Sequence, residues 1–445
     1  MKYISIIGMG YVGLCTAVGF ASKKSKIIAV EKDIEKLSLI KNGRSPFHEP
    51  HLNALLQKSI ENEFFRCTSD LDEAVLKTQV TFITVGTPSK PDGSIDLSQI
   101  LTCAAAVGKA LVKTDRYHLV VIKSTVIPET TGKYVRPLLE RYSKKRCGSD
   151  FGLCMNPEFI REGSAMYDTL HPDRIIIGKF DEKSGEVLEE LYRKLYSDDI
   201  PPIIKTSLST AEIIKYANNT FLATKISYIN TIANICEKIP EADIKIVANA
   251  LGLDNRINPK FLRAGLGYGG SCFSKDINAL IAFSKQNNYN PTFLESIQEV
   301  NAQQINHVIE LAETKLGPLF NKKIAILGLS FKPETDDLRE ARSIQLITKL
   351  INKGAKISVY DPVAMPNAKM IFKNKITYNK SSSDCLKNAE CCIIVTEWNE
   401  FKKLKPENYK EKMKNPIVID GRRIYNPKDF NKGITYVAIG LGNKD

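Results

Sequence analysis

The sequence lacks several features that would point to particular classes of protein. Its 445 residues include ten cysteines but no C-x-x-C pair, and the five histidines have no spacing typical of metal ligands. We therefore expect reduced thiols, no metal site and a cytoplasmic location. No run of 18 apolar residues is present, so we expect no membrane-spanning segment and no membrane partner. Short repeats and low-complexity tracts are also missing.

The composition that is present is that of an ordinary globular protein, with 43% hydrophobic and 25% charged residues. A chain of this length is expected to form two or three domains. Lys and Arg number 63 against 50 Asp and Glu, and the net charge of +13 favours anionic partners such as phosphates. The basic residues are spread along the chain without a recognisable nucleic-acid-binding motif, so we predict no nucleic-acid partner.

The N-terminal stretch allows two interpretations. Met1 and Lys2, followed by mostly apolar residues to Ser22, resemble a secretory signal. Against this interpretation, four glycines interrupt the stretch, and a short apolar strand is predicted directly afterwards at 26–30. The order strand, glycine turn, helix, strand favours a folded α/β unit.

Apolar runs and helical patterns alternate through the first two hundred residues. Strands are predicted at 2–7, 26–30, 80–85, 119–122, 152–155 and 174–177, with helices at 11–22, 97–112 and 131–143. This alternation predicts an α/β fold with a parallel, doubly wound, Rossmann-like sheet. Residues 197–208, which include Pro201 and Pro202, are predicted to form a linker.

The remainder of the chain divides into a helical part and a second α/β part. Ser209 and Glu212 form a capping-box pattern, which predicts the start of a long helix over 211–238, and a further helix is predicted at 244–251. Strands predicted at 323–327, 356–360, 391–395 and 417–419, with a helix at 343–353, indicate a second Rossmann-like unit. We therefore predict three domains, 1–207, 208–316 and 317–445. The long apolar helix needs a partner surface, so we predict that the central domain forms a homodimer.

The motif Gly8-x-Gly10-x-x-Gly13 lies between the first predicted strand and helix. Such glycines allow a tight turn and a close approach of the backbone to a pyrophosphate at the helix N-terminus. Glu31 ends the next strand, where a carboxylate can bind ribose hydroxyls and would repel a 2′-phosphate. The motif thus favours NAD over NADP, although two lysines follow Glu31 closely. The alternative is a glycine-rich corner that binds no ligand.

A glycine-rich loop places one cysteine in an unusual setting. Four glycines lie between positions 265 and 270, and Cys272 follows them immediately before a predicted helix start, with Lys275 and Asp276 beside it. A helix N-terminus and a neighbouring ammonium both stabilise a thiolate. Cys272 is therefore the predicted nucleophile, whereas the other nine cysteines lack this setting.

Two further pairs of polar residues have a spacing that suits a site. Lys215 and Asn219 are four residues apart on the long predicted helix and so share one face, either as a functional pair or as solvated surface. Glu158 and Glu162 follow a predicted strand end, where ligands gather in parallel sheets. These carboxylates suit acid–base work or cofactor contact, and the alternative is a helix start favoured by the macrodipole.

Together these motifs resemble those of the nucleotide-sugar dehydrogenases, the UDP-glucose/GDP-mannose dehydrogenase family. The resemblance covers nearly the whole chain and is carried by GMGYVG, VGTPS, KST, NPEFIREG, the K-x-x-x-N helix, GYGGSCFSKD, LGLSFKPETDDLRE and DGRR. The loop GYGGSCFSKD is most similar to that of the UDP-glucose branch. The resemblance implies a four-electron oxidation of the C6 primary alcohol of UDP-glucose to UDP-glucuronate, with NAD as the cofactor. GDP-mannose and UDP-galactose stay open as alternative substrates.

The resemblance also implies roles for particular residues. Cys272 would form a thiohemiacetal and then a thioester that water hydrolyses, with Lys215 and Asn219 stabilising oxyanion charge, Asp276 assisting proton transfer, Glu158 activating water and Thr125 ordering water or cofactor. The implied NAD-binding residues are Gly8, Gly10, Tyr11, Val12, Gly13, Glu31, Lys36, Thr87, Thr125, Glu162 and Arg339. The implied substrate-binding residues are Glu158, Phe159, Glu162, Lys215, Asn219, Arg256, Phe261, Arg263, Tyr268, Gly269, Phe331, Lys332 and Arg422, of which Arg256 would act across a subunit interface.

A different class of protein would keep these folds without catalysis, as a binding or regulatory protein that uses NAD. The presence of Cys272, Lys215 and Asp276 together argues against that class, because a binding protein has no need of a nucleophile. The implied partners are therefore a small-molecule nucleotide sugar and further copies of the same chain.

Overall fold

The computed structural model describes residues 3–197, 199–430 and 433–442. The chain forms two compact units, of which unit 1 comprises Met1–Asn218 with Asn278–Asn287, and unit 2 comprises Asn219–Ile277 with Asn288–Asp445. The boundary between the units falls inside one helix, α9 (Leu208–Cys236). The predicted division into 1–207, 208–316 and 317–445 stays a prediction.

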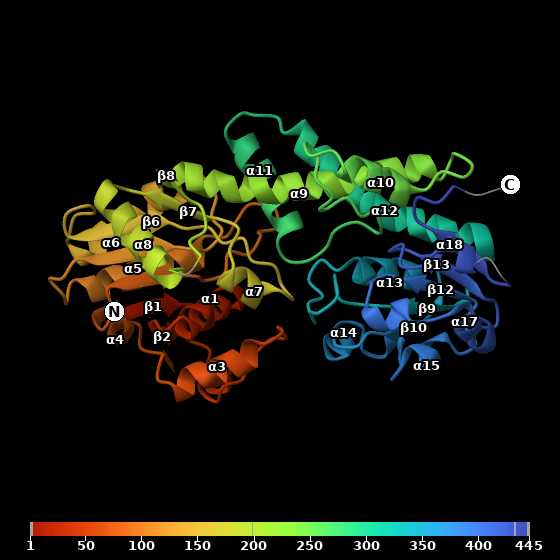
Figure 1. The fold of residues 1–445 in the computed structure, drawn as a ribbon, viewed down its shortest axis with the longest axis horizontal. Coiled ribbons are helices and arrows are strands. Elements are labelled where there is room, and N and C mark those ends of the chain that lie inside the picture. The colour runs from red at the N-terminus through yellow and green to blue at the C-terminus, as the bar shows by residue number, and fades with distance from the viewer. Residues whose placement is uncertain (1–2, 198, 431–432, 443–445) are drawn as a thin grey trace. The chain divides into compact units, whose positions relative to one another are not determined.

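Unit 1 is built on an eight-stranded sheet in the order β3-β2-β1-β4-β5-β6-β7-β8 (Figure 1). The strands are β1 (Tyr3–Ile7), β2 (Lys26–Val30), β3 (Phe65–Thr68), β4 (Val80–Ile83), β5 (His118–Ile122), β6 (Phe151–Met155), β7 (Ile175–Lys179) and β8 (Ile203–Ser207). The first six strands have the Rossmann order, and every pair is parallel except β6 with β7. The predicted Rossmann-like sheet is confirmed, with this one antiparallel pair added.

Helices cover both faces of the sheet in unit 1. They are α1 (Tyr11–Ser22), α2 (Ile34–Lys41), α3 (Leu52–Glu61), α4 (Leu71–Leu76), α5 (Ser98–Leu111), the π-helix η1 (Thr130–Val135), α6 (Arg136–Ser143), α7 (Ala165–Leu170) and α8 (Glu182–Leu195). Successive strand side chains point to opposite faces, so Ile27 and Ala29 pack in one apolar core, whereas Ile28 and Val30 pack in the other. The first core includes α1, α3 and α8, and the second includes α4, α5 and α6.

Two predictions at the end of this sheet are wrong. The expected linker 197–208 contains β8, which pairs with β7 in parallel, and α9 begins directly after it at Leu208. The predicted capping box is also wrong, because Ser209 already lies inside α9, and Ser207 instead accepts a hydrogen bond from the Thr210 N–H near the helix start, at 3.2 Å. Glu212 instead accepts a hydrogen bond from the Thr131 N–H, at 2.7 Å. Its carboxylate therefore joins α9 to η1 rather than closing the helix end.

Unit 2 contains a second parallel sheet, in the order β11-β10-β9-β12-β13-β14. Its strands are β9 (Lys323–Leu327), β10 (Lys356–Tyr360), β11 (Thr377–Tyr378), β12 (Cys391–Ile394), β13 (Ile417–Asp420) and β14 (Thr435–Ala438). This order repeats that of the first six strands of unit 1, and the predicted second Rossmann-like domain is confirmed. Its helices are α13 (Arg342–Asn352), α14 (Met365–Phe372), η2 (Lys373–Lys375), α15 (Ser382–Leu386), α16 (Asn399–Lys402), α17 (Pro406–Lys412) and α18 (Pro427–Phe430).

The predicted helical middle of the chain is also confirmed. It consists of α9, α10 (Ile244–Gly252), α11 (Phe273–Gln286) and α12 (Thr292–Leu316). Among the residues that the structure describes, none of the helices is both long enough and apolar enough to cross a bilayer.

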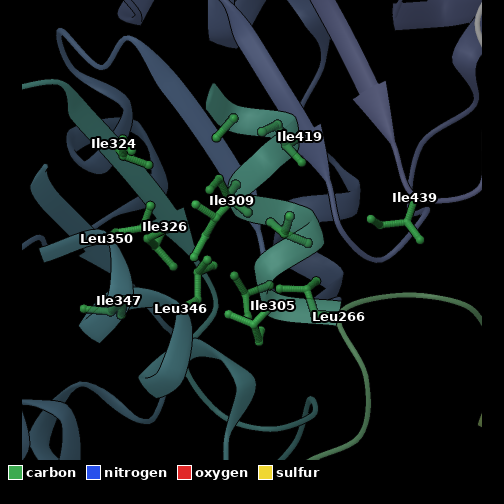
Figure 2. Close-up of a cluster of buried hydrophobic side chains, with 14 of the residues drawn as sticks. Leu266, Ile305, Ile309, Ile324, Ile326, Leu346, Ile347, Leu350, Ile419 and Ile439 are labelled. Carbon is green, nitrogen blue, oxygen red and sulfur yellow. The ribbon is translucent and has the colours of Figure 1, made fainter. Parts of the chain in front are cut away.

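The core of unit 2 joins α12 to the second sheet. Ile305 and Ile309, one turn apart on α12, lie in the same buried cluster as Ile324 and Ile326 of β9 (Figure 2). Leu266, from the glycine-rich loop that precedes Cys272, is fully buried in this cluster. The loop is therefore anchored in the core of unit 2 a few residues before the predicted nucleophile.

Candidate active site

The turn after β1 has the geometry that its glycine motif predicts. Gly8 has a φ of +96°, and a Cβ atom at Gly13 would lie 1.9 Å from the Gly8 carbonyl oxygen, so a larger residue at either position would be strained. Helix α1 begins at Tyr11, directly after Gly10, and its first N–H groups therefore border the turn. A Cβ at Gly10 would meet no atom within 4 Å, which leaves the backbone there open to approach. The turn fits a pyrophosphate at a helix N-terminus.

Glu31 lies beside this turn and is 8% exposed. One carboxylate oxygen accepts a hydrogen bond from the Met9 N–H at 3.0 Å, and the other accepts one from the Asp33 N–H at 2.9 Å. A carboxylate held at the turn offers acceptors to ribose hydroxyls and opposes a 2′-phosphate. These residues fit NAD. Lys36, by contrast, is exposed on α2.

Two other predicted residues meet at the carboxyl ends of β4 and β5. The Thr87 hydroxyl donates a hydrogen bond to the Thr125 carbonyl oxygen at 2.8 Å. Since ligands of doubly wound sheets bind at this edge, the contact places both threonines where a cofactor is expected. Tyr11, the first residue of α1, also has a defined partner, because its hydroxyl donates to the Glu49 carboxylate.

Glu158 and Lys215 form a buried ion pair in unit 1. The Lys215 ammonium lies 2.8 Å from Glu158 Oε1 and also donates to the Glu158 carbonyl oxygen at 2.8 Å, and the two side chains are 5% and 6% exposed. The second carboxylate oxygen accepts a hydrogen bond from the Ile160 N–H at 2.8 Å. Lys215 is therefore not solvated surface. The segment after β6 is not helical until α7 begins at Ala165, so the alternative of a helix start at Glu158 is wrong.

Asn219, one turn after Lys215 on the same face of α9, belongs to a second buried cluster, in unit 2. Its side-chain amide donates a hydrogen bond to Asp276 Oδ2 at 2.6 Å, and the Lys275 ammonium lies 2.5 Å from Asp276 Oδ1. Asp276 is 1% exposed. Both of its oxygens are thus held in place by side chains that the sequence singled out.

Cys272 differs from the other cysteines in its surroundings. Of the ten thiols, all within described residues, Cys272 is the exposed one, eight are buried and Cys147 is half-buried. Burial raises the pKa of Cys67, Cys103, Cys147 and Cys385 to about 12, which makes them poor nucleophiles near neutral pH. Cys272 directly precedes α11, and its carbonyl oxygen accepts the hydrogen bond from the Asp276 N–H at 2.9 Å. A thiol at a helix N-terminus is in the position that favours the thiolate.

Two predicted substrate-binding residues, Phe331 and Arg422, and the predicted NAD-binding residue Arg339 meet the glycine-rich loop in unit 2. The Gly270 N–H donates to the Arg339 carbonyl oxygen at 3.1 Å, and a Cβ at Gly270 would lie 2.8 Å from the Phe331 ring. Arg422 donates to the Gly267 carbonyl oxygen at 3.4 Å. Close approach therefore explains the glycines, and the loop brings Phe331, Arg339 and Arg422 together.

Four other predicted substrate-binding residues lie in less defined surroundings. Arg256 is 89% exposed and pairs with Asp254 at 2.6 Å, and Arg263 is exposed as well. The Phe261 ring lies 6.3 Å from the Phe273 ring, and the Lys332 ammonium lies 5.5 Å from the Phe331 ring centre. The functional roles of all the predicted residues stay predictions.

Two residues near the site were not predicted. Glu49 accepts hydrogen bonds from the N–H groups of Gly163 and Ala165 at 2.7 and 2.8 Å, so it fixes the segment that follows Glu158 and Glu162. Lys123, at the end of β5, donates to Asn156 Oδ1 at 2.9 Å, and burial lowers its pKa to about 8. Glu49 stands in no recognisable motif. Lys123 precedes two hydroxyl residues after a strand end, which by itself is a weak signal.

Comparison with known proteins decides the family. The models that describe the UDP-glucose/GDP-mannose dehydrogenase family match its NAD binding domain at residues 2–196, its central domain at 209–303 and its UDP binding domain at 325–427. The chain belongs to this family. It is an NAD-dependent nucleotide-sugar dehydrogenase, as its sequence motifs predicted.

Relatives and a solved structure cover the chain almost completely. A UDP-glucose 6-dehydrogenase of Haloferax volcanii is 42% identical over 98% of this chain and 99% of its own length. A UDP-glucose 6-dehydrogenase of Bacillus subtilis is 39% identical over 99% of this chain and 93% of its own. The structure of a UDP-glucose dehydrogenase from Pyrobaculum islandicum has a TM-score of 0.92 at 35% identity, covering 99% of this chain and 98% of that one. The similarity thus extends over both Rossmann-like domains of this dehydrogenase and its helical middle.

Proposed function

We propose that the chain oxidises the C6 primary alcohol of UDP-glucose to the carboxylate of UDP-glucuronate. The observation that carries the proposal is the exposed Cys272 thiol at the start of α11, on a loop that packs against Phe331 and Arg422 in the UDP binding domain. The relatives named above, all called UDP-glucose dehydrogenases, support this substrate over other nucleotide sugars.

The chemistry explains why such an enzyme needs a thiol. Oxidation of an alcohol to a carboxylate removes four electrons in two steps, and an aldehyde lacks the hydroxyl from which the second step can start. NAD, when bound, supplies the two-electron acceptor of each step. The Cys272 sulfur adds to the aldehyde carbon, and the resulting thiohemiacetal becomes a thioester when it loses a hydride from carbon and the proton of its hydroxyl group. Water then cleaves the carbon–sulfur bond, which releases the carboxylate and restores the thiol.

The buried polar groups are proposed to support these steps. Lys215 and Asn219 share one face of α9, and their N–H donors stabilise negative charge on the tetrahedral oxygen. Asp276, held by Asn219 and Lys275, assists proton transfer through water. Glu158 activates the water that cleaves the thioester, and Thr125 orders water or cofactor. The Gly8–Gly13 turn, Glu31 and Thr87 hold the NAD.

The proposal predicts a fixed stoichiometry. With limiting UDP-glucose and excess NAD, two NADH are expected for each sugar consumed, and UDP-glucuronate is expected as the product by mass spectrometry. UDP-galactose and GDP-mannose, supplied at the same concentration, are expected to give no comparable yield. A ratio of one NADH per sugar would contradict the covalent mechanism. If GDP-mannose alone gave two NADH per sugar, the proposal that UDP-glucose is the substrate would be wrong.

We also propose that the chain forms a homodimer through its helical middle. Phe221, Tyr228 and Ile235 recur every seven residues along α9 and are 64%, 52% and 51% exposed. Ile246 on α10 and Leu253, the residue that follows this helix, have the same spacing and are 70% and 77% exposed. Apolar side chains that repeat at this interval form a stripe on one side of a helix, and an apolar stripe of this kind favours burial against a partner.

Light scattering tests this proposal. The expected mass is twice the chain mass of 49.7 kDa or a higher even multiple, and Phe221→Asp is expected to shift the enzyme towards the single-chain mass. Phe320→Asp is the matched control, because Phe320 is 70% exposed but lies outside the stripe. A single-chain mass for the unaltered protein at micromolar concentration would contradict the proposal.

A further inference from the structure

The loop that carries Cys272 is held by side chains to which no role has yet been given. Arg342, the first residue of α13, is 3% exposed, and its Nε donates a hydrogen bond to the Leu266 carbonyl oxygen at 2.9 Å. Its Nη2 donates to the Asn301 carbonyl oxygen at 2.5 Å, and its Nη1 donates to Gln345 Oε1 at 2.9 Å. One guanidinium therefore links the loop to α12 through two main-chain carbonyls.

Helix α12 also binds the same loop directly, through hydrogen bonds. The Asn301 side chain accepts a hydrogen bond from the Tyr268 N–H at 2.8 Å and donates one to the Tyr268 carbonyl oxygen at 3.1 Å, so it imitates a strand partner. Gly267 has a φ of +95°, and a Cβ there would lie 2.3 Å from Asn301 Oδ1, which explains why glycine precedes Tyr268. Asn301 is 3% exposed. The contact is therefore shielded from solvent, and the Asn301 side chain bonds to main-chain groups of Tyr268.

A third contact fixes the far side of Cys272. Gln298 is three residues before Asn301 and shares its face of α12. It accepts a hydrogen bond from the Tyr268 hydroxyl at 2.7 Å and donates one to the Ser274 carbonyl oxygen at 3.2 Å, in the first turn of α11. Both ends of the segment 268–274 are thus tied to one face of α12, and the exposed Cys272 lies between them.

The chemistry of these contacts points to placement of the loop. A buried guanidinium is costly to desolvate, and burial lowers the pKa of Arg342 to about 10, so it stays protonated at neutral pH. The five N–H donors of a guanidinium have a rigid, planar arrangement. In Arg342, two of the three nitrogens donate to main-chain carbonyls. Leu266, fully buried in the core of unit 2, already anchors the loop by its side chain (Figure 2). The polar contacts add what an apolar anchor lacks, which is a fixed orientation of the peptide groups.

We propose that Arg342 and Asn301 are positioning residues, which hold the backbone from Leu266 to Tyr268 so that the Cys272 sulfur meets the substrate carbonyl in one orientation. The proposal rests on the proposed function of Cys272. Because Arg342 begins a helix of the UDP binding domain, it also makes the position of the thiol depend on that domain. Reaction rates are sensitive to such placement, since a shift of about 1 Å can cost about a hundredfold.

Two variants test the proposal in the full-length enzyme. Arg342→Met removes every donor at nearly the same length, and Asn301→Ala removes both contacts to Tyr268. Each is expected to lower kcat with UDP-glucose by about 10- to 100-fold while the KM for NAD changes less than about twofold. Hydrogen exchange of the peptide covering 266–274 is expected to become faster in both variants, because Asn301→Ala removes the acceptor of the Tyr268 amide and Arg342→Met removes the donor that holds the Leu266 carbonyl. Arg342→Lys, which keeps the charge but not the planar arrangement of donors, is expected to recover only part of kcat.

Gln345→Ala is the matched control, because it removes a partner of Arg342 without touching the loop, and its kcat is expected to stay at the wild-type value. Faster exchange over 266–274 together with a wild-type kcat would overturn the proposal. If Arg342→Met does not fold, Arg342→Lys and Asn301→Ala give the same comparison. Failure of the unaltered enzyme to oxidise UDP-glucose would instead contradict the proposed function, and the two failures are therefore distinguishable.

Discussion

Cys272→Ala is expected to reduce the formation of UDP-glucuronate by at least about 10³-fold, because loss of a nucleophile removes the covalent route to the second oxidation. Binding of NAD is expected to persist, since the glycine turn and Glu31 lie in the NAD binding domain, whereas Cys272 lies in the central domain. The melting temperature is expected to change little, because the thiol is exposed and contributes little burial. Steady-state assays, isothermal titration with NAD and thermal melts measure these three quantities.

Cys147→Ala is the matched control for this experiment. Cys147 is half-buried, and burial raises its pKa to about 12, so its removal is expected to leave turnover unchanged. Cys272→Ser is expected to retain a slow, oxygen-linked or aldehyde-stage reaction, because a hydroxyl is a weaker nucleophile than a thiolate. If Cys272→Ala formed UDP-glucuronate at the wild-type rate, the covalent mechanism would be wrong.

Lys215→Met is expected to lower kcat by about 10²- to 10³-fold, which is the usual effect of removing one donor to a tetrahedral oxyanion. The variant also leaves the Glu158 carboxylate buried without its cation, at a cost of about 3–5 kcal/mol in the free energy of unfolding. Steady-state kinetics and denaturant unfolding at neutral pH measure the two effects separately.

The double variant Lys215→Met with Glu158→Leu separates catalysis from stability. Replacement of a buried ion pair by apolar side chains of similar volume is often neutral, so the free energy of unfolding is expected to recover towards the wild-type value. The kcat is expected to stay low, because the stabilising charge is still missing and the proposed water-activating carboxylate of Glu158 is now missing as well. Recovery of kcat along with stability would mean that Lys215 only neutralises Glu158.

Much of the fold could be predicted because its signals are local. The predicted helix 11–22 and strand 26–30 coincide with α1 and β2, since a buried parallel strand is a continuous apolar run and the glycines mark the turn between strand and helix. The two edge strands of this sheet were not predicted, because the prediction depended on continuous apolar runs. β3 (FRCT) and β8 (IIKTS) are partly exposed and carry charged residues, so their sequences have no continuous apolar run.

The two Rossmann-like units and the dinucleotide turn could be predicted from the amino-acid sequence alone, and Cys272 could be proposed as the nucleophile, because each depends on residues close together in the chain. Only the tertiary structure decided which polar groups meet. Glu158 pairs with Lys215 across 57 positions, Asn219 with Asp276 across another 57, and Arg342 with Leu266 across 76. No periodicity in the local sequence predicts such pairings. They arise when packed helices and sheets bring distant residues together, because a buried polar group is stabilised when it finds a hydrogen-bond partner.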